Sequence, residues 1–254
     1  MPLPRTPSFR LDGRRALVAG GSRGIGLGCA VALAEAGAHV VVAARGQAQL
    51  AAAVAEMQEA GLSAEALVLD VADVEAVETA VAAGGPFDIL VNSAGIARHG
   101  PALDTAPADF DAVMAANLRG AYFLATAVAR GLAQAGKPGS IVQISSQMGH
   151  VGGIDRAVYC ASKHAVEGMT KAMAIEWGPK GIRVNTICPT FILTELTQAT
   201  FDDPDKRAWI EAKIKLGRVG RIEDIMGACV YLAGDGAALV TGTALLVDGG
   251  WTAG

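Results

Sequence analysis

The chain has 254 residues, of which 52% are hydrophobic, and a formal net charge of -4. This length fits one large domain or two small ones, and it is enough to bury a substantial core. The acidic balance and the absence of a dense Lys/Arg block argue against a nucleic-acid-binding surface. The four cysteines are widely spaced without a metal-ligand pattern, so we expect buried thiols in a reducing compartment and no metal.

The sequence shows no sign of export or membrane insertion in its first residues or in its apolar runs. Residues 1–10 lack the apolar segment of a signal peptide, and we expect them to form a flexible arm. No charge-free apolar run reaches the roughly 18 residues that a membrane span needs. The sequence therefore predicts a cytoplasmic protein that binds neither membranes nor nucleic acid.

Short apolar runs alternate with longer helical patterns along the chain. The runs are mostly non-alternating, as expected for strands covered on both faces, and they lie at 16–19, 39–43, 66–69, 89–91, 140–144, 183–187 and 244–247. The helical patterns lie at 25–36, 48–60, 74–83, 107–134, 158–178 and 223–233. Such alternation indicates βαβ units with right-handed crossovers.

The predicted fold is therefore α/β: one Rossmann-type doubly wound domain with a seven-stranded, mainly parallel sheet flanked by helices. We find no internal linker or repeat, so residues 11–254 are expected to form this single domain. Residues 194–217 are polar and interrupt the strand–helix rhythm, which makes them the best candidate for a mobile lid.

A glycine-rich loop follows the first predicted strand and precedes a helix. Glycines at this point let the backbone approach a pyrophosphate, which the helix N-terminus then stabilises. The spacing is G-x-x-x-G-x-G, which differs from the common dinucleotide fingerprint, and a tight turn is the alternative interpretation. We predict a dinucleotide site that includes Gly20, Ser22, Arg23, Gly24, Ile25 and Gly26.

The ends of the next strands carry further candidates for cofactor binding. Arg45 stands where an acidic residue would bind the 2′-hydroxyl of NAD, and an arginine there suits a 2′-phosphate, so NADP(H) is expected with NAD(H) as the alternative. Asp70 and Val71 end the third strand; Asp70 is placed either to accept from an adenine amino group or to cap a turn. The fourth strand ends in a turn that contains Asn92, Ala94 and Gly95.

Tyr159 and Lys163 are four residues apart in a predicted helix, so their side chains lie on one face. A tyrosine with a pKa of about 10 exchanges protons poorly at neutral pH, and a fixed cation beside it lowers that pKa. The pair indicates a general acid/base, although a half-buried tyrosine and a solvated lysine would give the same spacing. Ser145 and Ser146 end the fifth strand and would bring a hydroxyl near the phenol.

Taken together, these motifs resemble those of the short-chain dehydrogenases/reductases. The match extends from about residue 11 to residue 250 and keeps the family's order. Its parts are Gly20/Gly24/Gly26, Asp70, Asn92-Ser93-Ala94-Gly95, Asn117, Ser146, Tyr159-x-x-x-Lys163, Cys188-Pro189 and Val247-Asp248-Gly249-Gly250. Ser146 precedes Tyr159 by the family's usual thirteen residues.

The resemblance implies a catalytic tetrad. Tyr159 would exchange a proton with the substrate oxygen, Lys163 would lower the pKa of Tyr159 and bind the nicotinamide ribose, and Ser146 would hold the carbonyl oxygen. Asn117 would anchor a water molecule that relays protons to Lys163. Pro189, Thr190, Ile192 and Thr194 would contact the nicotinamide end of the cofactor. The chain departs from the family pattern at three positions: Ala19 in place of Thr, Ser93 in place of Asn and Thr190 in place of Gly.

The substrate is less well defined by the sequence. Ser146, Met148, His150 and Tyr159 are the expected substrate contacts, with Gln147, Val151, Arg156 and His99 as further candidates by position. The chain resembles members that act on sugar acids, polyols or ketoses, with 3-oxoacyl thioester reduction as the alternative. A non-catalytic cofactor-sensing protein and another Rossmann-type enzyme, such as a methyltransferase, are the other classes considered. By resemblance we expect a homotetramer.

Overall fold

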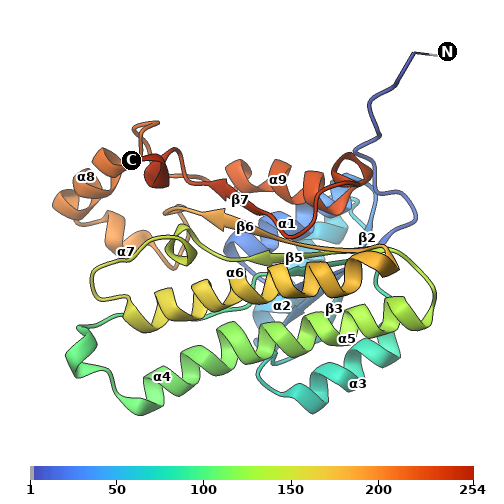
Figure 1. The fold of residues 1–254 in the computed structure, drawn as a ribbon, viewed down its shortest axis with the longest axis horizontal. Coiled ribbons are helices and arrows are strands. Elements are labelled where there is room, and N and C mark those ends of the chain that lie inside the picture. The colour runs from blue at the N-terminus through green and yellow to red at the C-terminus, as the bar shows by residue number, and fades with distance from the viewer. Residues whose placement is uncertain (1–2) are drawn as a thin grey trace.

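The computed structural model describes residues 3–254 and contains one parallel sheet covered by helices on both faces (Figure 1). All strand pairs are parallel, and the strand order is β3-β2-β1-β4-β5-β6-β7. The strands are β1 (Arg15–Ala19), β2 (His39–Ala44), β3 (Ala64–Val68), β4 (Ile89–Asn92), β5 (Gly139–Ile144), β6 (Ile182–Pro189) and β7 (Ala244–Val247). The predicted doubly wound α/β fold is confirmed, with seven strands that are all parallel.

Two helical layers enclose the sheet. One layer holds α1 (Gly24–Glu35), α2 (Gln47–Glu59) and α9 (Glu223–Ala233). The other holds α3 (Val74–Gly84), α4 (Pro107–Met114), α5 (Ala121–Gln134) and α6 (Ala157–Trp177). Two further helices, α7 (Gln198–Phe201) and α8 (Pro204–Lys213), lie near the C-terminus at one end of the molecule (Figure 1).

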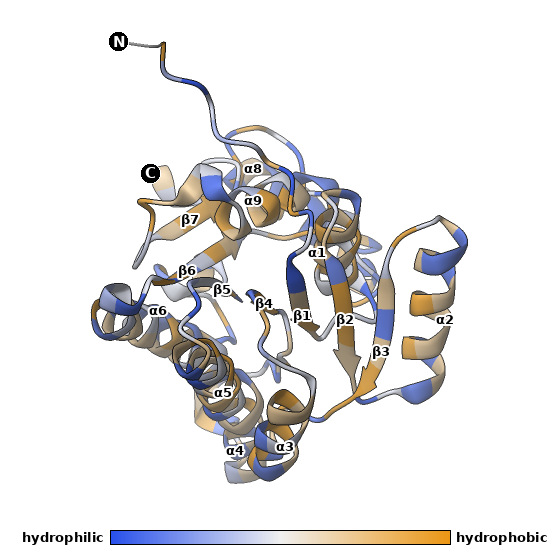
Figure 2. Cartoon of the chain, turned by 90° about the vertical axis from the view of Figure 1, so that its right-hand side faces the viewer, coloured by the Kyte–Doolittle hydropathy of each residue, from blue (hydrophilic) through white to orange (hydrophobic). Residues whose placement is uncertain are grey.

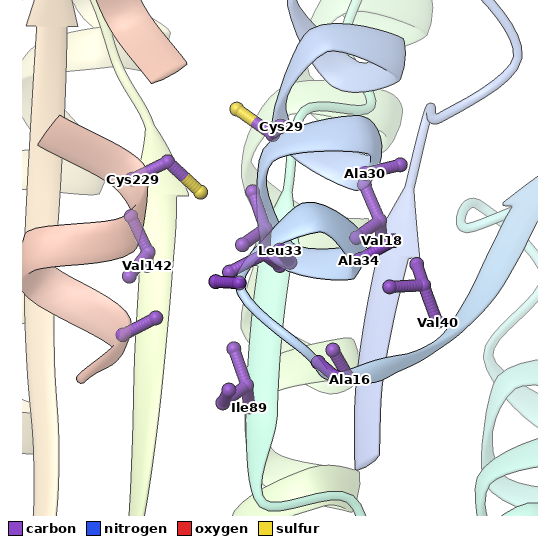
Figure 3. Close-up of a cluster of buried hydrophobic side chains, with 14 of the residues drawn as sticks. Ala16, Val18, Cys29, Ala30, Leu33, Ala34, Val40, Ile89, Val142 and Cys229 are labelled. Carbon is purple, nitrogen blue, oxygen red and sulfur yellow. The ribbon is translucent and has the colours of Figure 1, made fainter. Parts of the chain in front are cut away.

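Alternate side chains of each central strand pack into two separate apolar cores, one on each face of the sheet. Ala16 and Val18 of β1 join the core under α1 and α9, whereas Leu17 and Ala19 join the core under α3 and α5. Figure 3 shows the first of these cores, where α1 and α9 lie beside the sheet. Burial on both faces explains why these strands read as continuous apolar runs in the sequence. In Figure 2, helix α2 turns its hydrophobic side toward the edge of the sheet.

The order of the strands fixes where a ligand can bind. The chain winds outward from β1 to β3, then returns to β4 on the other side of β1 and winds toward β7. The carboxyl ends of β1 and β4 therefore form the switch point at which ligands bind in folds of this type. The glycine loop, the Asn92 turn and the segment after β5 all start at this edge.

Several segments differ from the sequence prediction, and one of them is β6, which ends at Pro189, two residues after the predicted end. Strand β3 starts at Ala64, two residues before the predicted start, and it is an edge strand in which Val68 is half exposed. The predicted helix 107–134 is interrupted by a π-helical stretch, Ala115–Gly120, which contains Asn117. The predicted lid at 194–217 contains the helices α7 and α8 and is more regular than its sequence indicated.

Residues 3–10 are exposed, and Arg10 donates a hydrogen bond to the carbonyl oxygen of Glu35 over 2.9 Å; residues 1 and 2 of the predicted arm lie outside the described residues.

One stretch, Pro107–Gln134, is long and apolar enough to cross a membrane by length and composition alone. Half of its most apolar window is buried inside the protein, where α5 packs against α3, α6 and β5.

Candidate active site

The glycine loop brings backbone into contact with backbone at the switch point. Gly20 has a φ of 71°, and a Cβ atom there would lie 2.7 Å from the backbone nitrogen of Ala94. A Cβ atom at Gly26 would lie 2.1 Å from the carbonyl oxygen of Gly20. Side chains are therefore excluded at both positions, and α1 begins directly behind the loop at Gly24. This geometry leaves the helix N-terminus open to an anion.

The residues at this edge fit a dinucleotide. A Cβ atom at Gly24, whose φ is 55°, would lie 3.6 Å from the Thr194 methyl carbon, so the loop and the segment after β6 meet where a pyrophosphate is expected. The buried hydroxyl of Thr190 has no hydrogen-bond partner in the described chain, which leaves a free polar atom beside Pro189. Ile192, two residues after Thr190, is buried.

Arg45 and Asp70 lie together at the ends of β2 and β3. Arg45 Nη1 is 3.7 Å from Asp70 Oδ2, and the two side chains are 68% and 44% exposed. Asp70 Oδ1 also accepts a hydrogen bond from the backbone nitrogen of Ala72 over 3.0 Å, so the capping alternative is present in the structure. An exposed ion pair of this kind contributes little, so Arg45 is free to turn to another anion. Arg23 is exposed at the N-terminus of α1, whereas Ser22 is partly buried and lies 3.5 Å from Gln49.

Two buried asparagines shape the turn after β4. Asn92 donates to Gln143 Oε1 over 2.9 Å and accepts from the backbone nitrogen of Ala94 over 3.2 Å. Asn117 accepts from the Ile96 nitrogen over 2.8 Å and donates to the Ile96 carbonyl oxygen over 2.9 Å. Asn117 is therefore bound to the loop that includes Gly95, and π-helical turns of the kind that holds it are frequent at functional sites.

The structure brings Ser146, Tyr159 and Lys163 to one point beside the switch edge. Tyr159 and Lys163 lie on the same face of α6, with the Lys163 ammonium 5.7 Å from the centre of the Tyr159 ring. Lys163 is buried and donates to the Ile144 carbonyl oxygen over 2.8 Å. Ser146 begins a short turn after β5, and its hydroxyl oxygen accepts from the Met148 nitrogen over 3.1 Å. The Ser146 hydroxyl acts on Tyr159 as a hydrogen-bond donor and can turn its proton to a substrate oxygen bound beside the phenol.

The pKa of Tyr159 moves in the direction opposite to the sequence expectation. Burial raises the pKa of Tyr159 above its usual value, although a hydrogen bond from Ser146 and the nearby Arg156 cation act to lower it. Burial lowers the pKa of Lys163 to about 8, with Cys188 and Glu167 acting to raise it. Lys163 is not among the groups that act on the pKa of Tyr159 in the protein alone, so its predicted role in lowering that pKa stays a prediction. The lysine is itself buried and directed to a backbone oxygen, and burial outweighs neighbouring charges.

Arg156 and His99 face Tyr159 from the other side. The rings of His99 and Tyr159 meet edge to face with their centres 5.9 Å apart, and Arg156 Nη1 contacts His99 Nε2. The guanidinium of Arg156 also lies 5.3 Å from the centre of the Phe191 ring. Burial and the neighbouring Arg156 lower the pKa of His99, which favours its neutral form. Within residues 3–254, Arg156 makes no ion pair with a carboxylate.

Met148 and His150, two of the predicted substrate contacts, lie in different surroundings from each other. Met148 packs near Arg156, because a Cβ atom at Gly153 would lie 2.9 Å from both side chains. His150 instead turns its Nε2 to Cys188 Sγ, 3.4 Å away, and lies 3.8 Å from the carboxylate of Glu167. Sequence reasoning did not identify Glu167, which is buried and follows Lys163 by four residues. That spacing was the available signal, since it extends the Tyr159/Lys163 face of the helix.

The segment between Thr194 and Gly217 is attached to the domain by its own small core. Buried Phe201, Ile210, Ile214 and Val219 pack together with Phe191 and Trp251. The segment starts and ends side by side, because Leu193 donates to the Gly220 carbonyl oxygen and Gly220 donates to that of Phe191. The segment and the residue after it carry five basic side chains: Lys206, Arg207, Lys213, Lys215 and Arg218. Three of them are in ion pairs: Lys206 with Asp203, Arg207 with Glu211 and Arg218 with Asp224.

Comparison with known proteins gives consistent results. A family model described as Enoyl-(Acyl carrier protein) reductase matches residues 19–252. The chain is 41% identical over 245 residues to L-xylulose reductase from Bos taurus, covering 96% of this chain and 99% of that protein. Among solved structures, it superposes with a TM-score of 0.93 and 39% identity on a gluconate 5-dehydrogenase from Burkholderia cenocepacia in complex with NADP and tartrate, covering 97% and 98%. A short-chain type dehydrogenase/reductase from Mycobacterium marinum gives 0.91 and 38%, with the same coverage.

Proposed function

The chain belongs to the short-chain dehydrogenase/reductase family, and from this premise we propose that it interconverts a ketone and a secondary alcohol on a sugar acid with NADP(H). As a family member it is an oxidoreductase that acts on alcohol and carbonyl groups, and its relatives act on sugars and polyols. The observation that carries the sugar-acid proposal is Arg156, a partly buried cation beside Tyr159 that makes no ion pair with a carboxylate among residues 3–254.

In the proposed mechanism, the protein holds the reacting oxygen and moves its proton. The Ser146 hydroxyl donates to the substrate oxygen, and Tyr159 gives that oxygen a proton during reduction or takes one during oxidation. Lys163 binds the nicotinamide ribose, and Asn117 keeps the loop after β4 in place through its two bonds to Ile96. NADP(H) supplies or accepts the hydride when it is bound. The Tyr159 phenol, whose pKa is raised by burial, is protonated at neutral pH, and this is the form that can give a proton in reduction.

The proposed preference for NADP(H) rests on Arg45 and Arg23. Both are exposed at the edge where the adenosine ribose is expected, and guanidinium groups bind phosphate as paired donors. The B. cenocepacia relative has NADP bound, which supports the same choice here. Asp70 is the competing partner of Arg45, and NAD(H) remains the alternative cofactor for this reason.

The proposed substrate carries a carboxylate that binds Arg156. An arginine that is partly buried needs a partner, because a desolvated charge is costly unless it is paired. Its stacking on Phe191 and its contact with His99 hold the guanidinium in one direction. A carboxylate bound there would place a neighbouring carbonyl group near Tyr159 and Ser146. The tartrate found in the B. cenocepacia relative is a small hydroxylated dicarboxylate of this chemical class.

The alternative, 3-oxoacyl thioester reduction, has less support. A large acidic carrier would need a basic surface at the entrance, and the basic residues of the segment after Thr194 are mostly paired. Lys213 and Lys215 are the two that have no ion pair within the described chain. Lys213 lies over the ring of Trp209, 5.9 Å from its centre.

We also propose that the protein is a homotetramer in the cytoplasm. We further propose that Thr194–Gly217 is a mobile lid over the substrate. Exposed apolar side chains support the assembly: Phe110 and Tyr122 lie on α4 and α5, and Leu246 lies on the edge strand β7. The paired ends of the lid segment support its movement as a unit, because Leu193 and Gly220 are already joined.

A turnover assay over matched substrate pairs tests the proposed function. Each pair has the same carbon number and differs only in a terminal carboxylate or a terminal hydroxymethyl group, and each is measured with NADPH and with NADH. We expect reduction of a keto sugar acid with NADPH and a kcat/KM at least about tenfold above that of the neutral ketose. Equal turnover of the two members of each pair contradicts the carboxylate assignment. No turnover of any carbonyl compound contradicts the whole proposal.

A further inference from the structure

Behind the active site, three potential metal ligands from distant parts of the chain come together. His150 follows the turn that begins at Ser146, Glu167 lies on α6 and Cys188 lies on β6. Cys188 is separated from Glu167 by 21 residues and from His150 by 38 residues. Such spacing matches no short metal-binding motif, which is why the sequence indicated no metal site.

The separations of the three ligand atoms fit one tetrahedral ion. Glu167 Oε1 is 3.2 Å from Cys188 Sγ, Cys188 Sγ is 3.4 Å from His150 Nε2, and His150 Nε2 is 3.8 Å from Glu167 Oε1. Bonds of about 2.0–2.3 Å to a tetrahedral zinc ion place its ligand atoms roughly 3.3–3.7 Å apart. All three distances lie within a few tenths of an ångström of that range. We propose that His150, Glu167 and Cys188 bind a zinc ion.

The electrostatics of the cluster favour a bound cation. Glu167 is 5% exposed, and within residues 3–254 its one ion-pair partner is His150, which carries a charge only when protonated. A buried carboxylate is costly unless it is paired or coordinates a metal ion. The hydrogen bonds from Thr186 and Cys188 satisfy the carboxylate oxygens but do not neutralise the charge. Lys163 is near enough for Glu167 to raise its pKa, but within residues 3–254 it makes no ion pair with this carboxylate, so a zinc ion would supply a direct counter-charge.

A second observation supports a ligand at this place. The Ser145 hydroxyl is 4% exposed and has no hydrogen-bond partner in the described chain. It lies beside the cluster, since a Cβ atom at Gly149 would be 3.1 Å from both the Ser145 oxygen and the Glu167 Cγ. Burial raises the pKa of the Cys188 thiol to about 12, and the hydroxyls of Thr186 and Ser145 act to lower it, so Ser145 lies near the sulfur. This hydroxyl is a suitable partner for a water molecule in the fourth position of the ion.

The kind of metal follows from the ligands. A thiolate, an imidazole and a carboxylate suit zinc, whereas Mg²⁺ and Ca²⁺ prefer oxygen ligands alone. Thr186 donates to the second oxygen of Glu167 over 3.0 Å and so orients the carboxylate toward the cluster. Binding would displace the Cys188 proton to solvent. The His150 side chain is 28% exposed and gives the ion a route from solvent.

Cobalt substitution tests the proposal on the full-length protein without any activity measurement. After treatment with a chelator, we expect the protein to bind one Co²⁺ with a thiolate-to-cobalt charge-transfer band and the strong visible bands of a tetrahedral site. Cys188→Ser should remove the charge-transfer band. Cys229→Ala is the matched control, because this buried cysteine lies in the core between α1 and α9 (Figure 3), and it should keep the band.

Zinc affinity and thermal stability provide the second measurement. We expect Zn²⁺ to displace Co²⁺ and to raise the Tm of the wild type, because it binds the folded state. His150→Ala should weaken zinc binding at least about tenfold and reduce the rise in Tm. This variant changes a partly exposed side chain, so it keeps the test available if Cys188→Ser fails to fold. The proposal is overturned if no charge-transfer band forms, if Cys188→Ser retains it, or if His150→Ala binds zinc as tightly as the wild type.

Discussion

On the cofactor side of the site, Gly20 and Gly26 bring main chain against main chain, and no side chain would fit between them. On the substrate side, Arg156, His99 and Phe191 meet through their side chains around Tyr159. The first arrangement can hold any dinucleotide pyrophosphate, since it offers backbone N–H groups and a helix end. The second depends on individual side chains, so we expect it to determine which substrate is accepted. Substitutions on the cofactor side should therefore impair cofactor binding, whereas those on the substrate side should alter substrate preference.

The largest effect is expected on the cofactor side from Gly26→Ala. The added Cβ atom would lie 2.1 Å from the carbonyl oxygen of Gly20, so the loop or α1 must move. We expect loss of NADPH binding and a large fall in Tm, measured by fluorescence titration and thermal unfolding. Gly131→Ala is the control, because its Cβ atom meets nothing within 4 Å on helix α5, and it should stabilise by about 0.5–1 kcal/mol. Normal NADPH binding by Gly26→Ala would contradict the inference that the cofactor side depends on close contact between main-chain atoms.

Arg156→Leu should change the substrate side and leave cofactor binding intact. A charge-assisted hydrogen bond is worth about 1.5–3 kcal/mol, so kcat/KM for a keto sugar acid should fall about 10- to 150-fold. The neutral ketose of the same length should change little, which makes it the internal control. An equal loss for both substrates would show that Arg156 acts on structure and not on the carboxylate.

Arg156→Leu should also change the pH dependence of alcohol oxidation. The Arg156 cation lowers the pKa of Tyr159, so its removal should raise that pKa further. Alcohol oxidation needs the phenolate as proton acceptor, so its rate should rise with pH and the rise should move to higher pH in Arg156→Leu. The measurement is kcat/KM for oxidation of a neutral polyol from neutral to alkaline pH. A profile that stays in place would contradict the electrostatic coupling of the two side chains.

Arg45→Asp should shift the cofactor preference by a smaller factor. Arg45 is 68% exposed, so loss of its contact to a 2′-phosphate should weaken NADPH binding about tenfold relative to NADH. The new carboxylate also faces Asp70, and Arg45→Gln separates this repulsion from the loss of the arginine. The ratio of the two dissociation constants is the measurement. An unchanged ratio in both variants would remove Arg45 from the cofactor site.

The smallest effect concerns the base of the lid segment, where Arg218 and Asp224 form a pair 2.6 Å apart. The hydrogen bond from Arg218 lowers the pKa of Asp224 to about 2 from 3.8. A lowered folded pKa stabilises the protein above pH 3.8, and this contribution is lost as the pH falls toward 2. Both side chains are partly exposed, so Asp224→Asn should cost at most about 1 kcal/mol at neutral pH and nothing near pH 2, measured by urea unfolding. A cost independent of pH would contradict the ion pair.

Much of the fold was predictable because burial leaves a mark on the sequence. Strands β1, β2 and β4 have both faces covered, and their apolar runs placed them to within one residue. Edge strand β3 was predicted two residues late, because one side is open and its sequence includes Glu65 and the exposed Val68. The π-helical stretch at Asn117 has no sequence signal, since the bonds to the Ile96 backbone come from the tertiary fold.

The residues around Tyr159 were less predictable, because their contacts also come from parts of the chain that are distant in sequence. The position of His150 beside other candidates suggested a substrate contact, but its Nε2 is turned to Cys188, which is remote in sequence. The Tyr159/Lys163 spacing gave the right helix face and the wrong direction for the pKa of Tyr159. A sequence shows which charges are near one another on a helix but not how deeply they are buried, and burial dominates here.

The most direct test of the account is turnover by Tyr159→Phe, which removes one hydroxyl and keeps the ring against His99. We predict that kcat falls about 10²- to 10⁴-fold on every accepted substrate, because the proton donor is lost. The dissociation constant of NADPH should stay within about twofold of the wild type, since the glycine loop and Lys163 are unchanged. Full turnover by Tyr159→Phe would contradict the assignment of Tyr159 as the group that exchanges the proton.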